Sequence, residues 1–161
     1  MLIYLLRHGE AVSSHHPHDS ERSLSELGKR QAKAVGAFCA RQQIQLDAIF
    51  SSPLVRAKET AEPLRVLFPD ARYSATELLV PGARITSLLE HVNGSRSDSV
   101  MLIGHEPMMS ELVSVLVSGD REFKVEFEKA TLACVEAVVP LQKGRGFLKW
   151  LQPANHLMHV D

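Results

Sequence analysis

Residues 1–10 read MLIYLLRHGE, an apolar run that ends abruptly in polar and charged residues from Arg7 onward. Five consecutive apolar residues, 2–6, are typical of a strand that is buried on both faces, as in a parallel sheet covered by helices. No basic segment precedes this run and charges soon follow it, so it is neither a signal peptide nor a membrane span. The sequence therefore predicts a buried first strand with polar side chains at its carboxyl end.

Helices and strands alternate along the rest of the chain. Helical spacing of apolar residues predicts helices over about 25–42, from Ser52-Pro53 to 68, over about 83–92, and from Pro107 to 117. Short apolar runs predict strands over 47–50 and 99–104, and residues 72–76 are expected to form a third strand between them. Two late runs predict an antiparallel hairpin over 131–139 and 147–151. The alternation predicts a single domain over residues 1–161: a three-layer α/β/α sandwich with a mostly parallel central sheet and an antiparallel edge.

The composition is that of a soluble globular protein, with 45% hydrophobic residues, 23% charged residues and a formal net charge of −1. This charge balance gives no reason to expect nucleic acid or a membrane as a partner. A cytoplasmic location is the default expectation.

The residues that could bind metal are few and poorly spaced. Cys39 and Cys134 form no CxxC pair, so we expect two buried core residues rather than zinc ligands or a redox pair. His15, His16 and His18 share a polar loop without an accompanying cysteine or carboxylate pattern. An exposed cluster is therefore expected there rather than a metal site.

Arginine and histidine side chains follow three of the predicted strands. Arg7 and His8 come after the first strand, Arg56 after the second, and His105 after the fourth. The carboxyl ends of parallel strands meet at one edge of a sheet, and ligands of open α/β sheets bind there. Guanidinium groups suit phosphate oxygens, and the helices that begin beyond these strands would direct amide N–H groups to the same place. The sequence therefore predicts a phosphate site at this edge.

A histidine that acts as a nucleophile must be neutral at the attacking nitrogen. Neighbouring cations disfavour the protonated imidazole, so they lower its pKa and keep it neutral near pH 7. Arginines and histidines also supply the positive charge that phosphoryl transfer requires, so no metal or other cofactor is expected. Taken alone, His8 could be a structural histidine at a strand end, but Arg7, Arg56 and His105 together favour chemistry.

These segments resemble the signatures of a known family. RHGE at 7–10 resembles the RHG signature of the histidine phosphatase superfamily. SSPLVRAKETA at 51–61 resembles its second signature, and Gly104-His105 resembles its third. The likeness extends over about residues 1–118 and implies a phosphoglycerate mutase-like fold.

The resemblance also implies a role for each residue of the cluster. His8 would be the nucleophile that becomes phosphorylated, Arg7 and Arg56 would bind the phosphoryl group, and His105 would hydrogen-bond one of its oxygens. The reaction would be a two-step hydrolysis in which His8 attacks phosphorus and water then releases phosphate from phospho-His8.

Within the superfamily, the chain is most similar to SixA-type phosphohistidine phosphatases. Those proteins are similarly short and share RHGEA at 7–11 and a loop like RSLSELG at 22–28. The likeness implies a phosphohistidine-carrying phosphotransfer protein as partner and inorganic phosphate as product. Only about seven residues, 77–83, separate the third strand from the next helix, too few to fold a cap over the site. An uncapped pocket suits a protein side chain better than a sugar phosphate.

Two further residues are weaker candidates. Arg22 lies in the loop shared with SixA-type proteins, as a phosphate contact or as part of a pocket-shaping salt bridge with Asp19; a solvated loop residue is the alternative. Glu77 follows the third strand, where the superfamily often has a general acid; an exposed loop carboxylate is the alternative.

Two other functions stay open. One is a small-molecule phosphomonoesterase or mutase-like enzyme of the same superfamily. The other is a catalytically silent module that binds phosphate and serves in protein interaction.

Overall fold

A six-stranded sheet in the order β3-β2-β4-β1-β5-β6 forms the centre of the computed structural model, which describes residues 1–13, 15 and 18–158. Four strands are parallel: β1 (Leu2–Arg7), β2 (Ala48–Ser51), β3 (Arg72–Ala75) and β4 (Ser99–Gly104). The other two, β5 (Leu132–Ala137) and β6 (Gly146–Gln152), run antiparallel at one edge. The predicted sheet, mostly parallel with an antiparallel edge, is confirmed.

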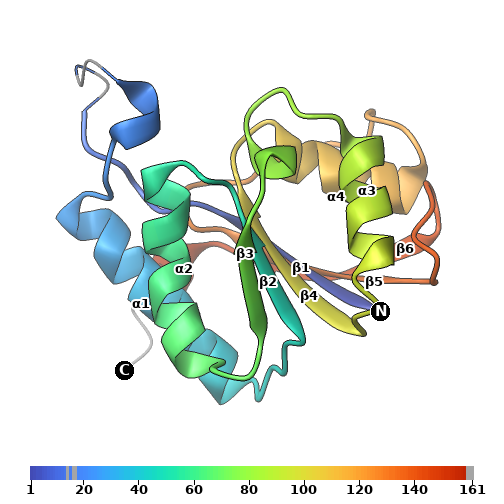
Figure 1. The fold of residues 1–161 in the computed structure, drawn as a ribbon, viewed down its shortest axis with the longest axis horizontal. Coiled ribbons are helices and arrows are strands. Elements are labelled where there is room, and N and C mark those ends of the chain that lie inside the picture. Colours follow the sequence, from blue (N-terminus) through green and yellow to red (C-terminus); the bar gives the residue numbers. More distant parts are fainter. Residues whose placement is uncertain (14, 16–17, 159–161) are drawn as a thin grey trace.

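Helices cover both faces of this sheet (Figure 1). One face carries α1 (Glu26–Arg41), α2 (Val55–Leu67) and the short α5 (Ala154–Leu157). The other carries α3 (Ile85–Gly94) and α4 (Met108–Ser118). Two 3-10 turns, η1 (Asp19–Glu21) and η2 (Glu77–Leu79), lie in the connections. The three-layer α/β/α sandwich is therefore confirmed.

The apolar run of β1 contributes to both hydrophobic layers. Ile3 and Leu5 pack in the cluster under α3 and α4, whereas Tyr4 and Leu6 pack in the cluster under α1 and α2. Successive side chains of a strand point to opposite faces, so a strand between two helical layers must be apolar at every position. None of the helices in the described part of the chain is long and apolar enough to cross a membrane.

Most element boundaries agree with the sequence, and the differences have local causes. Ser25 caps α1 as expected, because its Oγ accepts from the N–H of Gly28 at 3.1 Å. However, α2 begins at Val55 and not at Ser52-Pro53. The N–H of Ser52 still donates to Ile103 O at 2.9 Å, so this residue continues the sheet and cannot yet join the helix.

Three further differences concern short segments. The turns η1 and η2 lie in segments for which no helix or strand was predicted, and α5 was not predicted either. Three or four residues are too few for helical periodicity to be recognised. Both cysteines are buried and unpaired, as expected.

The antiparallel direction of β5 matters for the site. Because β5 runs opposite to β1, its amino end lies at the same edge as the carboxyl end of β1. There the N–H of Arg7 donates to Thr131 O, and the N–H of Ala130 donates to His8 O, each at 3.1 Å. The late part of the chain therefore joins the edge that carries Arg7 and His8.

Candidate active site

His8 lies directly beyond β1 at the carboxyl edge of the sheet, and it is only 3% exposed. Its Nδ1 lies 2.6 Å from the carbonyl oxygen of Gly9. A carbonyl oxygen can only accept, so Nδ1 carries the proton and Nε2 keeps its lone pair. The Nε–H of Arg56 donates to that Nε2 at 3.3 Å, which fixes the same tautomer.

Both histidines of the site have strongly lowered pKa values. Burial lowers the pKa of His8 to about 2, and the charge of Lys129 is the next largest cause of the decrease. Burial also lowers the pKa of His105 to about 4, followed by the charge of Arg56. Both imidazoles are therefore neutral near pH 7, the state that a histidine nucleophile requires.

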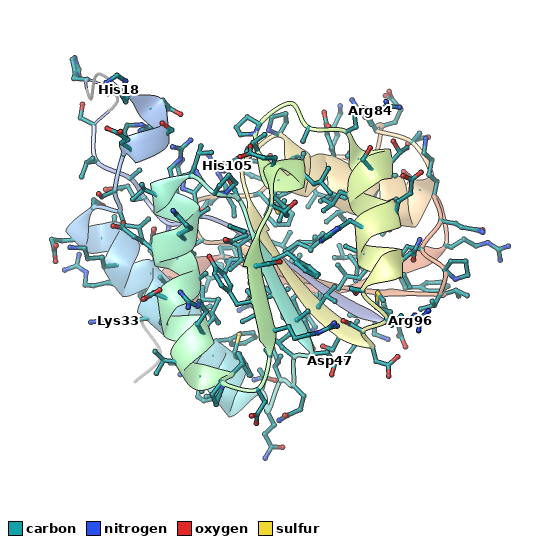
Figure 2. The ribbon with its side chains drawn as sticks, viewed as in Figure 1. His18, Lys33, Asp47, Arg84, Arg96 and His105 are labelled. Atoms are coloured by element: carbon teal, nitrogen blue, oxygen red, sulfur yellow. The ribbon has the colours of Figure 1, made fainter. Side chains whose placement is uncertain are left out.

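His105 follows β4 and faces His8. The two ring centroids lie 4.9 Å apart, and His105 is 2% exposed. Neither of its ring nitrogens has a hydrogen-bond partner among the described residues. Buried polar groups nearly always have partners, so these nitrogens indicate a place where a ligand binds. Figure 2 shows His105 at the upper end of the sheet, beside η2 and the start of α2.

Arg56 lies in the first turn of α2, is 4% exposed, and is held by η1. Its Nη1 donates to the backbone oxygen of Asp19 at 2.8 Å, and its Nη2 donates to Oδ2 of the same residue at 3.1 Å. These contacts leave Nε directed at His8. The guanidinium is thereby fixed in one orientation.

Arg7 is the last residue of β1. Its Nη1 donates to Phe127 O at 2.6 Å, whereas its buried Nε has no partner among the described residues. Arg7 pairs with Gly104 of β4, the residue directly before His105. The structure therefore brings Arg7, His8, Arg56 and His105 to one edge of the sheet.

Arg22 reaches this cluster through Asp19. Its Nε donates to Asp19 Oδ1 at 2.9 Å, and its Nη1 donates to Val12 O at 3.1 Å. Asp19 thus bridges two arginines, with one carboxylate oxygen directed to each. Arg22 is therefore held in a salt bridge and is not a freely solvated loop residue.

Glu77 begins η2 at the carboxyl end of β3, and its side chain is exposed. Its carboxylate forms no hydrogen bond or ion pair with any other described residue. Its role as a general acid stays a prediction. In the polar loop, His15 and His18 are exposed as expected, while His16 lies outside the described residues. Within the described ranges, no three metal-ligating side chains form a cluster that could hold a metal ion.

The sequence did not point to Lys129, which lies in the turn before β5. Its side chain is half-buried, and its charge lowers the pKa of both His8 and His105. The predicted antiparallel hairpin offered one signal. If its first strand pairs with β1, the residues that precede this strand, including Lys129, must lie at the carboxyl end of β1. That signal requires knowing which strand β5 pairs with.

A neutral, buried imidazole lies beside two arginines and a histidine that has no hydrogen-bond partner among the described residues, an arrangement that can bind and transfer a phosphoryl group. The family profile described as Histidine phosphatase superfamily (branch 1) matches residues 3–79. The homology and the fold of this chain match phosphatases of that superfamily.

Proteins of the SixA type match nearly the whole chain. The phosphohistidine phosphatase SixA of Escherichia coli (strain K12) is 24% identical over 160 residues, which cover 96% of each chain. A structure of the protein histidine phosphatase SixA complexed with tungstate superposes with a TM-score of 0.86 at 22% identity, over 98% of this chain and 99% of that one. The putative phosphohistidine phosphatase SixA from Agrobacterium tumefaciens superposes with a TM-score of 0.79 at 24% identity, over 94% and 96%. These structures share the fold of this chain.

Proposed function

We propose that the protein hydrolyses phosphohistidine on other proteins, with His8 as the nucleophile. The observation that carries this proposal is the hydrogen-bond pattern of His8: Nδ1 faces a carbonyl oxygen, so Nε2 is the unprotonated nitrogen, and its lone pair can attack once a phosphoryl group takes over the Arg56 Nε–H that it now accepts. Nε2 is directed toward the Arg56 guanidinium, which is where a phosphoryl oxygen would bind.

The reaction has two steps. In the first, Nε2 of His8 forms a bond to phosphorus while the bond from phosphorus to the substrate nitrogen breaks. The substrate imidazole, protonated on its other ring nitrogen, keeps the electron pair and leaves as a neutral molecule. In the second, water attacks phospho-His8, the bond from phosphorus to Nε2 breaks, and inorganic phosphate leaves. His8 returns to its neutral state with the proton still on Nδ1.

Three side chains stabilise the moving phosphoryl group. Among the described residues, the buried Nε of Arg7 and both ring nitrogens of His105 have no partner, so the Arg7 Nε–H and the single N–H of the neutral His105 ring can each donate to a phosphoryl oxygen. The guanidinium of Arg56 is oriented before substrate arrives, because Asp19 holds two of its nitrogens. Donors that are already in place need no reorganisation as charge builds up in the transition state.

The substrate proposal depends on the uncovered site. Between β3 and α3, residues 76–84 form only the turn η2, so this segment cannot fold a cap over the pocket. An uncapped pocket offers a small substrate few contacts beyond the phosphoryl group, and selectivity must then come from a protein that docks around it. Similarity to SixA over nearly the whole chain supports a phosphohistidine-carrying phosphotransfer protein as that partner.

The surroundings of the site carry charges of both signs. The positions that we assign to the rim on the sequence are Arg22, Glu77, Arg84 and Glu106. A mixed rim and a net charge of −1 suit a modest, transient association rather than a tight complex.

The test compares catalytic efficiencies on a phosphorylated histidine phosphotransfer protein and on small sugar phosphates. We expect a higher kcat/KM on the phosphoprotein. His8→Ala should lose turnover and the acid-labile phosphoenzyme, while the matched variant His156→Ala, at an exposed histidine, should keep both.

Other outcomes would point elsewhere. A higher kcat/KM on a sugar phosphate would make the protein a small-molecule phosphatase with the same nucleophile. Phosphate binding without any turnover would identify a silent binding module. A fully active His8→Ala protein would remove the nucleophile assignment.

A further inference from the structure

Lys129 is fixed to the site by the backbone on both sides of it. The turn that contains it is closed by a hydrogen bond from Thr131 N–H to Glu128 O at 3.1 Å. The next residue, Ala130, donates its N–H to His8 O at 3.1 Å. The turn therefore lies directly against the backbone of His8.

The side chain of Lys129 lies among other cations. Arg7 at the end of β1, Arg56 at the start of α2 and Arg22 beyond η1 all act on its ammonium group, and Glu10 is the opposing anion. Lys129 in turn acts on His8 and His105. Within the described residues, its ammonium group has no hydrogen bond or ion pair.

A half-buried ammonium group without a partner, beside three arginines, is unfavourable in a site that stays empty. A doubly charged phosphoryl group would make this cluster of cations favourable, because it supplies negative charge and several acceptor oxygens where the cations converge. Asp19 already engages Arg22 and Arg56, whereas Lys129 is left for the ligand.

We propose that Lys129 is a further catalytic residue, whose ammonium group contacts the phosphoryl group during transfer to and from His8. This inference rests on the proposed function, and it adds a lysine to the arginines and histidines of the site. Because the role is electrostatic, it requires the charged form of the lysine.

The charged form persists only over part of the pH range. Burial lowers the pKa of Lys129 to about 8, with the charges of Arg7, Arg56 and Arg22 acting in the same direction and Glu10 opposing them. In the free enzyme the ammonium is therefore present below about pH 8 and lost above it. The pH profile of kcat/KM reports groups of the free enzyme, so it should decline on the alkaline side near this value.

Three variants separate charge from structure. Lys129→Met keeps most of the side-chain length but removes the charge, Lys129→Arg keeps the charge at all accessible pH values, and Lys143→Met is the matched control. Lys143 is exposed in the hairpin between β5 and β6, at the opposite edge of the sheet. Each variant is assayed for kcat/KM on p-nitrophenyl phosphate from pH 6 to 10 and for binding of inorganic phosphate by calorimetry at pH 7.

We expect Lys129→Met to lower kcat/KM roughly 10- to 100-fold at pH 7, as for a lost hydrogen bond to a charged group. It should weaken phosphate binding and remove the alkaline decline. Lys129→Arg should keep activity close to wild type and move the decline to higher pH, a change that a purely structural role would not produce. Lys143→Met should match wild type in every measurement.

The inference is overturned if Lys129→Met matches Lys143→Met in kcat/KM, phosphate affinity and pH profile. It is also overturned if Lys129→Met does not fold and Lys129→Arg keeps the alkaline decline at its original pH. If the wild-type protein turns over no substrate, the proposed function fails, but the phosphate-binding measurement still tests the role of Lys129. Weaker phosphate binding by Lys129→Met would then support a contact between the ammonium group and phosphate, and unchanged binding would contradict that contact.

Discussion

Asp19 binds Arg56 twice, through its backbone oxygen at 2.8 Å and through Oδ2 at 3.1 Å, although the side chain of Asp19 is 66% exposed and that of Arg56 is almost fully buried. The exposed residue thus orients the buried one. Because Arg56 also donates to Nε2 of His8, Asp19 acts on the nucleophile without touching it.

Replacing Asp19 should therefore harm catalysis more than folding. In Asp19→Ala the Arg56 guanidinium loses a side-chain partner, and we expect kcat/KM to fall about tenfold, as for one lost charged hydrogen bond. An exposed ion pair contributes little to stability, so the melting temperature should barely change. Asp19→Asn, which keeps one acceptor oxygen, should recover part of the activity. Glu21→Ala, in the same turn, is the control, and an Asp19→Ala enzyme as active as that control would contradict the positioning role.

The two buried histidines should make the fold sensitive to acid. Their folded-state pKa values of about 2 and about 4 lie below the ordinary value of 6.5, so the unfolded chain binds more protons as the pH falls below 6.5. The contribution of the two neutral histidines to the free energy of unfolding is therefore fully present above about pH 6.5, and it decreases as the pH falls toward 4. Between pH 7 and pH 5 we expect each histidine to contribute a loss of about 1 to 2 kcal/mol in the free energy of unfolding.

Denaturant titrations at a series of pH values measure this loss. His105→Gln cannot take up a proton, so its free energy of unfolding should depend less steeply on pH between 7 and 5. An equally steep dependence in wild type and variant would mean that His105 is not the group responsible.

Glu77 should matter only where the leaving group needs a proton. The phenolate of phenyl phosphate is a poor leaving group, whereas the imidazole of phosphohistidine departs as a neutral molecule. Glu77→Gln should therefore reduce kcat on phenyl phosphate more than on a phosphohistidine protein. Equal reductions on both substrates would show that the exposed carboxylate does not act as the acid.

Gly28 in the first turn of α1 should tolerate no side chain. A Cβ at this position would lie 2.0 Å from the backbone oxygen of Glu10, so helix and loop would have to separate. We expect Gly28→Ala to destabilise the protein by about 1 to 3 kcal/mol, as for overpacking, and to reduce activity by displacing the backbone beside His8.

Gly94 provides the comparison, since a Cβ there meets nothing within 4 Å. Gly94→Ala should leave the melting temperature unchanged or raise it slightly. If thermal melting showed the two alanine variants to be equally stable, the close approach of Gly28 to Glu10 would be wrong.

The layers and the central residues of the site could be predicted because each depends on a local pattern. Arg7, His8 and His105 directly follow apolar runs long enough to be recognised as strands, and a parallel sheet brings such ends together. Lys129 could not be found in this way. Its place depends on β5 pairing with β1, a contact between segments far apart in the chain that no local pattern specifies.

The role of Asp19 was predictable only in part. Its spacing from Arg22 suggested a salt bridge, which is present. Its contact with Arg56 depends on the turn η1, which has only three residues and lies in a polar loop without periodicity. The tautomer of His8 was equally inaccessible, because it is set by the distance from Nδ1 to a carbonyl oxygen.

The hydrogen bond from Arg7 to Phe127 O joins residues that are 120 positions apart. During synthesis, His8 leaves the ribosome long before the segment that encloses it, and the strand β1 cannot acquire its neighbour β5 until that later segment has emerged. Pairings between such distant segments form slowly, because the entropy cost of closing a long loop comes before the favourable contacts between the strands can form. Until then, the imidazole of His8 is exposed to solvent, and its pKa is that of a histidine in an unfolded peptide. The pKa of His8 should therefore decrease only late in folding, after β5 has paired with β1. A measurement of this pKa can thus show when folding is complete.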